Sequence, residues 1–271
     1  SEDNFLLFTP MLPQVAAGTI ETRHIVTPIR TLIKKTKFYE AKIKNIDPHG
    51  KIVTLFGTKE SRGMRIHYDF LIVALGSQTN FFGMKDVEEN SYRMNTINDA
   101  IILRNRVIDL LEQAENETDP ILRKSLLQIV VVGGGFAGVE TAGEINDFIS
   151  EASEYYPSIN YKDVKVTLVE ATTEILNGFP KKLAGFAKEK LVERGIEVIL
   201  AAGVTSFNGQ EVMLKSQLDS NKMLVGDSSE HRGHYKLKEI SSIQTNTLIW
   251  TAGTTPIDLI KESLFKTSKG R

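Results

Sequence analysis

Three apolar stretches, each ending in a glycine or an acid, set the expected organisation of the chain. Residues 69–76 and 128–132 are continuous apolar runs, and residues 163–170 form a third run that ends in a carboxylate. Continuous apolar runs are typical of strands that are buried on both faces of a layered α/β domain. We therefore predict three strands, with helices between them.

The helices follow from apolar residues at helical spacing. Residues 96–115 predict one helix, because the apolar positions recur about every third or fourth residue at Ile97, Ile101, Val107, Leu110 and Leu111. A second helix is expected from residue 136 to about residue 153. Turn signals at 47–50 and 61–63 predict a small antiparallel β insertion within residues 38–67. The polar stretch 217–234 predicts a loop or a hairpin tip. Two related units are expected, with a boundary between Met84 and Asn98.

A glycine-rich turn directly follows the second run. Gly133, Gly135 and Gly138 have the GxGxxG spacing, with Phe136 and Ala137 between the last two glycines. Gly133 permits a tight turn, Gly135 lets the backbone approach a pyrophosphate, and Gly138 lets helix and strand pack closely. The helix N-terminus presents free N–H groups and a positive dipole end to phosphates. The motif alone carries little weight, but a strand before it and a helix after it favour dinucleotide binding over a purely structural turn.

Glu170 ends the third run, where a carboxylate accepts hydrogen bonds from a ribose 2′-hydroxyl and repels a 2′-phosphate. No arginine is nearby, so the sequence favours NAD(H) over NADP(H). Glu170 lies farther from the glycines than the usual ~20 residues. An extension around residues 155–158 would account for the difference. The alternative is a solvent-exposed carboxylate at a strand end.

Glu140, Glu144, Asp147 and Glu151 share one face of the helix that follows the glycines. A solvated acidic face explains most of this pattern. Glu140 lies in the first turns of the helix, near where the nicotinamide could reach, and we consider both a functional and a structural role for it. His231 and His234 lie in a polar loop without a suitably spaced third ligand, so no metal site is predicted.

Composition narrows the class of protein. With 33 basic and 34 acidic residues the formal charge is -1, and no basic block suggests nucleic acid. The absence of cysteine removes disulfide frameworks, iron–sulfur ligation and thiol catalysis. No apolar stretch approaches the roughly 20 residues of a membrane-spanning helix, and the N-terminus has no signal pattern. A soluble chain is therefore expected.

Several motifs occur in the order found in one known family. They are residues 4–13 (NFLLFTPMLP), 74–77 (ALGS), 80–83 (NFFG), 133–144, 169–171 (VEA), 175–179 (ILNGF) and 248–253 (LIWTAG). Together they resemble the type II NADH:quinone dehydrogenases, flavoproteins with two dinucleotide-binding domains in the pyridine nucleotide-disulfide oxidoreductase class. The resemblance covers nearly all of the chain.

The resemblance implies an α/β fold with two Rossmann-like domains, in which an NAD domain is inserted into an incomplete FAD domain. It assigns residues 1–95 to a partial FAD-binding domain, 96–252 to the NAD(H)-binding domain and 253–271 to a return segment. Thr9 and Pro10 would lie beside the isoalloxazine ring, and Ala74 to Gly76 would approach the FAD backbone. Ala252 and Gly253 would close the nicotinamide site.

The resemblance also implies an activity. NADH would pass a hydride to FAD, and electrons would continue to a quinone as part of a respiratory chain. Because the cofactors carry this chemistry, the protein mainly orients them. Glu140 corresponds to a family glutamate near the nicotinamide and the quinone entrance, and it is the candidate for proton supply.

Two family elements are not found, namely a glycine-rich turn near the N-terminus and the C-terminal Gly-Asp motif with its amphipathic helices. We therefore expect a chain truncated at both ends that binds FAD weakly or not at all. The family's peripheral attachment to the cytoplasmic side of a membrane would belong to the complete protein, which could also be a homodimer. The lack of cysteine disfavours disulfide and sulfide:quinone reductases. A ferredoxin or rubredoxin reductase and a non-catalytic NAD(H)-binding module remain as alternatives.

Overall fold

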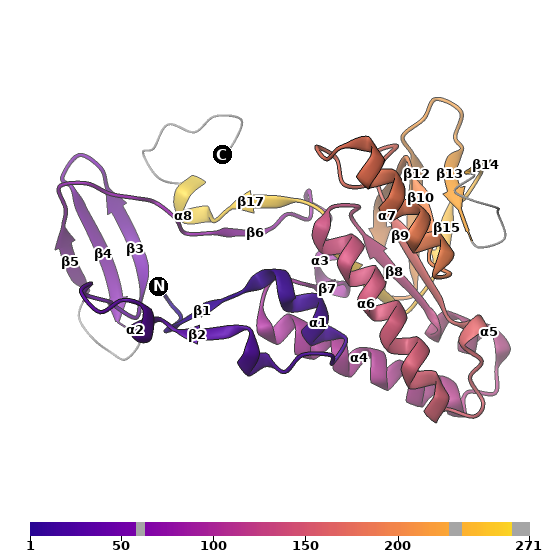
Figure 1. Cartoon of the computed structure of the whole chain (residues 1–271). Helices are drawn as coiled ribbons and strands as arrows, with labels where there is room; N and C mark the ends of the chain where they lie inside the picture. The colour runs from indigo at the N-terminus through magenta and orange to yellow at the C-terminus, as the bar shows by residue number, and fades with distance from the viewer. Residues whose placement is uncertain (58–62, 228–234, 262–271) are drawn as a thin grey trace. The chain divides into compact units, whose positions relative to one another are not determined.

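The computed structural model describes residues 1–57, 63–227 and 235–261, which pack as two compact units (Figure 1). The first unit takes residues 1–8 and 22–80 and the chain from residue 254 onward, within those described ranges. The second unit contains residues 9–21 and 81–253. The chain therefore enters and leaves the second unit twice.

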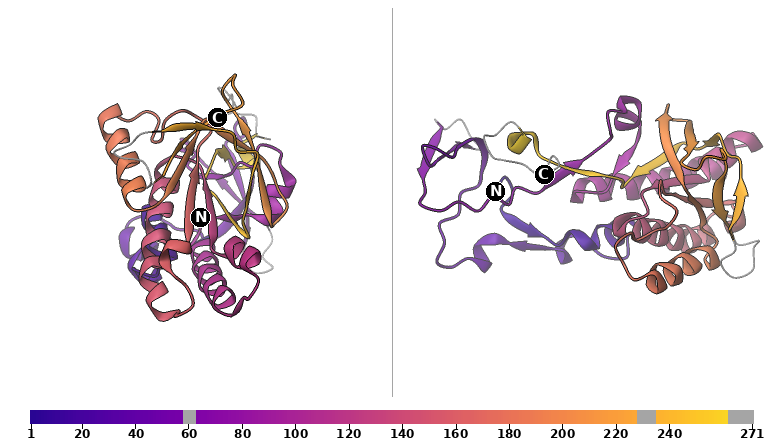
Figure 2. Two further views of the ribbon diagram at one scale, coloured as in Figure 1. Left: turned by 90° about the vertical axis from the view of Figure 1, so that its right-hand side faces the viewer. Right: turned by 90° about the horizontal axis from the view of Figure 1, so that it is seen from above.

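A seven-stranded sheet forms the centre of the second unit (Figure 2). Its strand order is β14-β13-β10-β9-β8-β16-β7. The five strands from β10 to β7 run parallel to one another. β13 pairs antiparallel with both of its neighbours, β10 and β14. The strands are β7 (Tyr92–Arg93), β8 (Gln128–Val132), β9 (Lys165–Val169), β10 (Glu197–Leu200), β13 (Met223–Gly226), β14 (Lys236–Lys238) and β16 (Thr247–Trp250). β8, the middle one of the five parallel strands, is buried over its whole length, as expected for a parallel strand covered on both faces.

Helices cover one face of this sheet (Figures 1 and 2). The longest, α4 (Ile97–Asn116), begins with a capping box in which Thr96 and Asp99 bond reciprocally to each other's backbone N–H groups. Its buried positions include Leu103, Val107 and Leu110. The other helices of this unit are α1 (Leu12–Ala16), α3 (Lys85–Asn90), α5 (Pro120–Leu126), α6 (Phe136–Ala152) and α7 (Lys181–Glu193).

A three-stranded antiparallel sheet packs on the opposite face. It consists of β11 (Ala202–Phe207), β12 (Glu211–Ser216) and β15 (Ser242–Gln244). Phe207 and Val212 from this sheet share one buried cluster with Val130 and Trp250 from the large sheet. The second unit is therefore a three-layer α/β domain.

The first unit consists of small antiparallel sheets. β1 (Phe5–Leu7) pairs with β2 (Val26–Pro28), and β6 (Ser77–Thr79) pairs with β17 (Thr254–Pro256). A third sheet contains β3 (Ala41–Asp47), β4 (Ile52–Gly57) and β5 (Met64–His67), with two short helices, α2 (Ile29–Leu32) and α8 (Asp258–Lys261), elsewhere in the unit. Asp47 stabilises the β3–β4 turn, because its Oδ1 accepts the backbone N–H groups of His49 and Gly50.

The fold class expected from the sequence is confirmed, as are two of the three strands, both helices and the antiparallel insertion. The strand predicted at residues 69–76 is wrong. This stretch forms no strand, and Phe70 and Ile72 are almost fully exposed. No described segment pairs with it, and an apolar run cannot form a strand without a neighbour to bond its backbone. The loop predicted at 217–234 is wrong for β13, because Met223 to Gly226 pair with β10.

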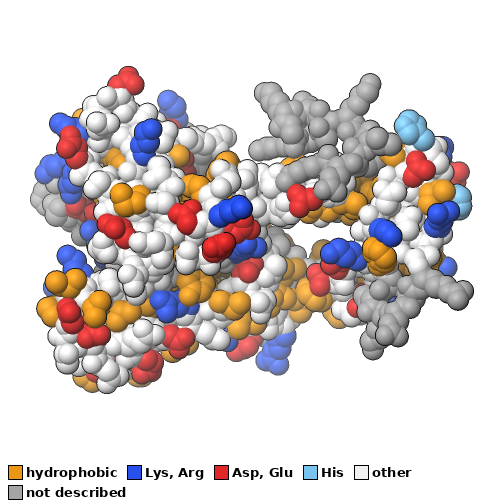
Figure 3. Space-filling model, turned by 180° about the vertical axis from the view of Figure 1, so that it is seen from behind, with side chains coloured by type: hydrophobic (Ala, Val, Ile, Leu, Met, Phe, Trp, Pro, Cys, Tyr) orange, Lys and Arg blue, Asp and Glu red, His pale blue; other side chains and the backbone are white. Residues whose placement is uncertain are grey.

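The surface mixes charges of both signs. On the face shown in Figure 3, acidic and basic side chains are interspersed with hydrophobic ones. This agrees with the near-zero net charge. Within the described ranges, none of the helices has both the length and the apolar content needed to cross a membrane.

Candidate functional site

The glycine-rich turn lies between β8 and α6, at the carboxyl ends of the parallel strands. Gly133 has φ +112°, a conformation that side-chain-bearing residues rarely adopt. Its N–H donates to the Val169 carbonyl of the neighbouring strand at 2.9 Å. A Cβ at this position would lie 2.8 Å from Thr251 Oγ1 and 2.9 Å from Ala252 N. The turn therefore packs tightly against the segment that follows β16.

Gly138 lies one turn into α6, where the helix touches the glycine turn itself. A Cβ on Gly138 would overlap the Gly133 carbonyl oxygen and would lie 2.7 Å from Thr251 Oγ1. Thr251 is fixed there because its hydroxyl donates to the Val132 carbonyl at 2.7 Å. Only glycine fits at position 138 in this packing.

Gly135 differs from the other two glycines because it faces open space. Nothing in the protein lies within 4 Å of a Cβ built on it, and Gly135, Phe136 and Ala137 are exposed. Gly135 caps α6 without any side-chain bond, so the N–H groups of the first helical turn point outward without intrahelical acceptors. These groups and the helix dipole give the turn the chemistry to bind an anion such as a pyrophosphate.

Glu170 is hydrogen-bonded to the same turn. Its Oε2 accepts the Gly134 N–H at 2.6 Å, and its Oε1 accepts the N–H and the hydroxyl of Thr172, each at 2.8 Å. Glu170 is half-buried, so the alternative of a merely solvent-exposed carboxylate does not describe it. The structure thus brings the acid to the glycines despite their separation along the chain.

Gly134 was not singled out by sequence reasoning, although it links the turn to the loop after β9. Its carbonyl accepts the Leu176 N–H at 2.7 Å. A Cβ on Gly134 would lie 2.9 Å from Ile175 Cγ2 and 3.0 Å from Glu170 Cγ. Three consecutive glycines were the available signal, because the middle one is outside the GxGxxG spacing and needs a reason of its own.

Glu140 projects from the second turn of α6 and is exposed. Although the residue as a whole is exposed, partial burial of its carboxyl raises the pKa of Glu140 above its ordinary value, and the charge of Glu144 raises it further. Glu144 accepts a hydrogen bond from Gln14 Nε2 at 3.1 Å, which ties α6 to α1. Glu140 therefore releases its proton at a higher pH than an ordinary glutamate does.

The remaining predicted residues are divided between the two units. Ala252 and Gly253 follow Thr251, and Ala252 lies against Gly133. Thr9 and Pro10 begin a short 3₁₀ turn (Thr9–Met11) before α1 in the second unit. Ala74 and Gly76 belong to the first unit, in the extended stretch before β6, and Gly76 has φ +73°.

No group of three or more possible metal ligands occurs among the residues that the structure describes. His231 and His234, for which the sequence predicted no metal, lie outside the described ranges.

Residues 1–271 match the pyridine nucleotide-disulphide oxidoreductase family, and the chain belongs to this family. The names of similar proteins are more specific than the family name. It is 34% identical over 284 residues to the mitochondrial external alternative NAD(P)H-ubiquinone oxidoreductase B3 of Arabidopsis thaliana, covering 100% of this chain and 45% of that protein. The external alternative NADH-ubiquinone oxidoreductase of Yarrowia lipolytica mitochondria is 34% identical over 276 residues, covering 98% and 45%. The chain spans about half the length of these relatives.

Solved structures of related enzymes are also similar to this chain. NDH2 from Plasmodium falciparum in complex with NADH matches with a TM-score of 0.81 and 26% identity, over 97% of this chain and 51% of that one. The sulfide:quinone oxidoreductase of Aquifex aeolicus, at 19% identity and a TM-score of 0.68 over 96% and 53%, shares the fold. The resemblance indicated by the sequence motifs is confirmed.

Proposed function

We propose that the second unit binds NADH within an FAD-dependent oxidoreductase that passes a hydride from NADH to flavin and electrons on to a quinone. The observation that carries this proposal is the clamped glycine turn, in which Gly134 bonds to Glu170 and Gly138 packs on Gly133. The names of the relatives support the acceptor, because they are ubiquinone oxidoreductases.

In this proposal the residues of the chain bind and orient the two cofactors. The open first turn of α6 at Gly135, Phe136 and Ala137 holds the pyrophosphate, and Glu170 accepts a hydrogen bond from the adenosine ribose. Ala252 and Gly253 close the nicotinamide end. When bound, FAD supplies the redox chemistry, and Thr9, Pro10, Ala74 and Gly76 are the residues proposed to contact it.

Glu140 is the proposed proton-holding group. Quinone reduction consumes protons, and a carboxyl with a raised pKa holds one nearer to neutral pH. Burial is the larger cause of this shift in pKa, and charge repulsion from Glu144, one helical turn away, adds to it. Loss of the Glu140 carboxyl should therefore affect the second half-reaction more than the first.

The proposal also covers the role of each domain and the location of the whole protein. Residues 1–95 and 253–271 would contribute to FAD binding, and residues 96–252 would bind NAD(H). The whole protein would act at a membrane surface as a peripheral enzyme, on the cytoplasmic side, with homodimers as one form.

An anaerobic absorbance spectrum tests the flavin part. The purified chain is mixed with FAD, freed of excess, and recorded before and after NADH. Bound flavin that is bleached by NADH and restored by a soluble quinone supports the proposal. If NADH binds but no flavin is retained, the chain itself is the non-catalytic NAD(H)-binding module. Restoration by an iron–sulfur protein in preference to quinone would instead indicate a ferredoxin or rubredoxin reductase.

A further inference from the structure

A cleft lies in the second unit, at the opposite edge of the large sheet from the glycine turn. It is lined at its floor by Gln128, Lys165 and Glu197, which are the first residues of β8, β9 and β10. Its volume is about 700 Å³. Four residue steps of roughly 3.3 Å separate Gln128 from the last residue of β8, so the two edges are about 13 Å apart. The cleft is thus separate from the proposed NADH site.

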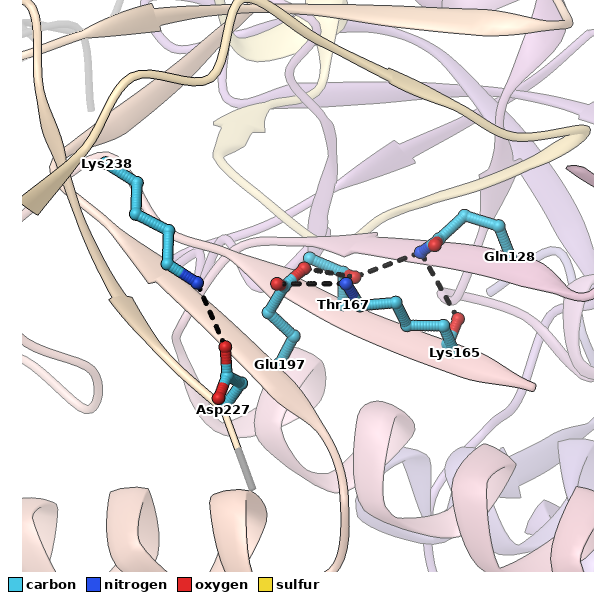
Figure 4. A network of polar contacts seen from close by, with 6 residues as sticks. All are labelled: Gln128, Lys165, Thr167, Glu197, Asp227 and Lys238. Atoms are coloured by element: carbon cyan, nitrogen blue, oxygen red, sulfur yellow. Dashed lines mark hydrogen bonds and ion pairs between the residues drawn. The ribbon is translucent and has the colours of Figure 1, made fainter. Parts of the chain in front are cut away.

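The floor of the cleft is fixed and electrically neutral (Figure 4). Lys165 Nζ lies 3.0 Å from Glu197 Oε1, and Thr167 Oγ1 donates to Glu197 Oε2 at 3.2 Å. Gln128 Nε2 donates to Thr167 Oγ1 at 3.0 Å. The Glu197 side chain is only 12% exposed. Both of its oxygens are therefore engaged, and its charge is cancelled by Lys165.

The walls carry positive charge that is not cancelled. Arg123 on α5 donates one Nη2 hydrogen bond to the Ser158 carbonyl, which holds the guanidinium in place. Within the described ranges its other N–H groups make no further hydrogen bond or ion pair. Lys124 and Lys162 also line the cleft, and no ion pair involves either of them within the described ranges.

Two carboxylates stand beside these cations. Asp227 forms an ion pair with Lys238 at 3.0 Å (Figure 4), so its charge is already balanced. Asp163 is the other, and it offsets one of the three wall cations. The residues that line the cleft therefore carry a net positive charge around a polar, water-accessible space. Apolar ligands would gain little there.

We propose that this cleft binds a phosphate dianion, either free or as the phosphate group of a small monoester. The positive charge favours an anion, and the Arg123 fork matches phosphate oxygens. Lys124 and Lys162 line the same cleft and add positive charge to it.

Amide chemical-shift titration of the 271-residue chain tests this, at constant ionic strength set with chloride. The probes are inorganic phosphate and glycerol 3-phosphate. We expect saturable shifts at cleft amides such as Val164 and Gly195, unchanged when NADH is present. Because a charged hydrogen bond contributes about 1.5–3 kcal/mol, Arg123→Gln should weaken binding about tenfold or more. Tighter binding of the monoester would assign the site to organic phosphates, and equal binding to the phosphate group alone.

Two further variants keep the test decisive. Lys162→Gln should also weaken binding, and it breaks no side-chain contact that the structure describes, so it does not depend on the fold surviving loss of Arg123. Lys85→Gln on α3 removes an equally exposed lysine outside the cleft and should have no effect. Shifts confined to residues 133–138, or equal weakening by Lys85→Gln and Lys162→Gln, would overturn the proposal.

Discussion

Glu170 Oε2 accepts the backbone N–H of Gly134 at 2.6 Å, across 36 residues of sequence. The carboxylate that the sequence assigned to ribose recognition therefore also clamps the glycine turn. With two further bonds from Thr172, three of about four acceptor positions of the carboxylate are in use. One position remains for a ribose hydroxyl. The turn and the acid are thus joined directly by a hydrogen bond.

Replacing Gly135 with alanine should separate binding from folding. A Cβ there meets no protein atom, and its φ of -76° suits alanine, so the free energy of unfolding in urea should stay within about 0.5 kcal/mol of the parent. The methyl group would occupy the space where a pyrophosphate approaches. NADH affinity, measured by fluorescence titration, should therefore fall at least about tenfold. Unchanged affinity would mean that the phosphates do not lie on Gly135.

Gly138→Ala should, in contrast, lower the free energy of unfolding. The added Cβ would overlap the Gly133 carbonyl, so the turn and α6 must separate, and unfolding in urea should show a loss of about 3 kcal/mol. Gly143→Ala is the matched control, since Gly143 lies in the interior of the same helix with nothing near its Cβ. It should gain about 0.5–1 kcal/mol. If both variants changed stability alike, the tight packing at Gly138 would be disproved.

Glu170→Gln should weaken NADH binding about tenfold, because a neutral amide bonds a hydroxyl less strongly than a carboxylate does. NADPH binding should fall less, since the charge that repels a 2′-phosphate is gone. Glu174→Gln in the same exposed loop serves as the control and should bind both nucleotides like the parent. The ratio of the two dissociation constants is the quantity to compare. A ratio unaffected by Glu170→Gln would remove its proposed role in choosing NADH.

Glu140 should make stability depend on pH. Its pKa is raised in the folded chain, so the folded state holds the proton more tightly than the unfolded state. Its contribution is present at low pH and is lost as the pH rises from the ordinary glutamate value through the raised one. Relative to Glu140→Gln, the parent should therefore lose stability across this window in urea unfolding series. Glu144→Gln should move the window to lower pH, and a pH-independent difference would contradict the assignment.

The sequence predicted much of the second unit because its signals were local. The buried run of β8, the glycines and the capped, amphipathic α4 each specify their own structure within a few residues. β13 was missed because Met223 to Gly226 form a short run in polar surroundings, and only pairing with β10 makes it a strand. The strand expected at 69–76 failed for the reverse reason, since its apolar content was clear but the described residues give it no partner.

The sequence identified candidate residues of the site but not the contacts between them. Gly133 and Gly138 could be named from their spacing, and Glu170 from its place at the end of a strand-like run. Their contacts with Thr251 and Gly134 could not, because those contacts depend on how β8, β9 and β16 lie side by side. Pattern alone gives which residues have the right chemistry, whereas tertiary packing decides which of them touch.

Titration of the purified 271-residue chain with NADH, without flavin, shows whether the second unit binds the nucleotide. Trp250 is the single tryptophan and directly precedes Thr251, which packs against the glycine turn, so its fluorescence can follow the titration. We expect saturable binding of one NADH per chain, tighter than NADPH, by a chain that remains folded. A folded chain without saturable NADH binding would rule out the proposed nucleotide site.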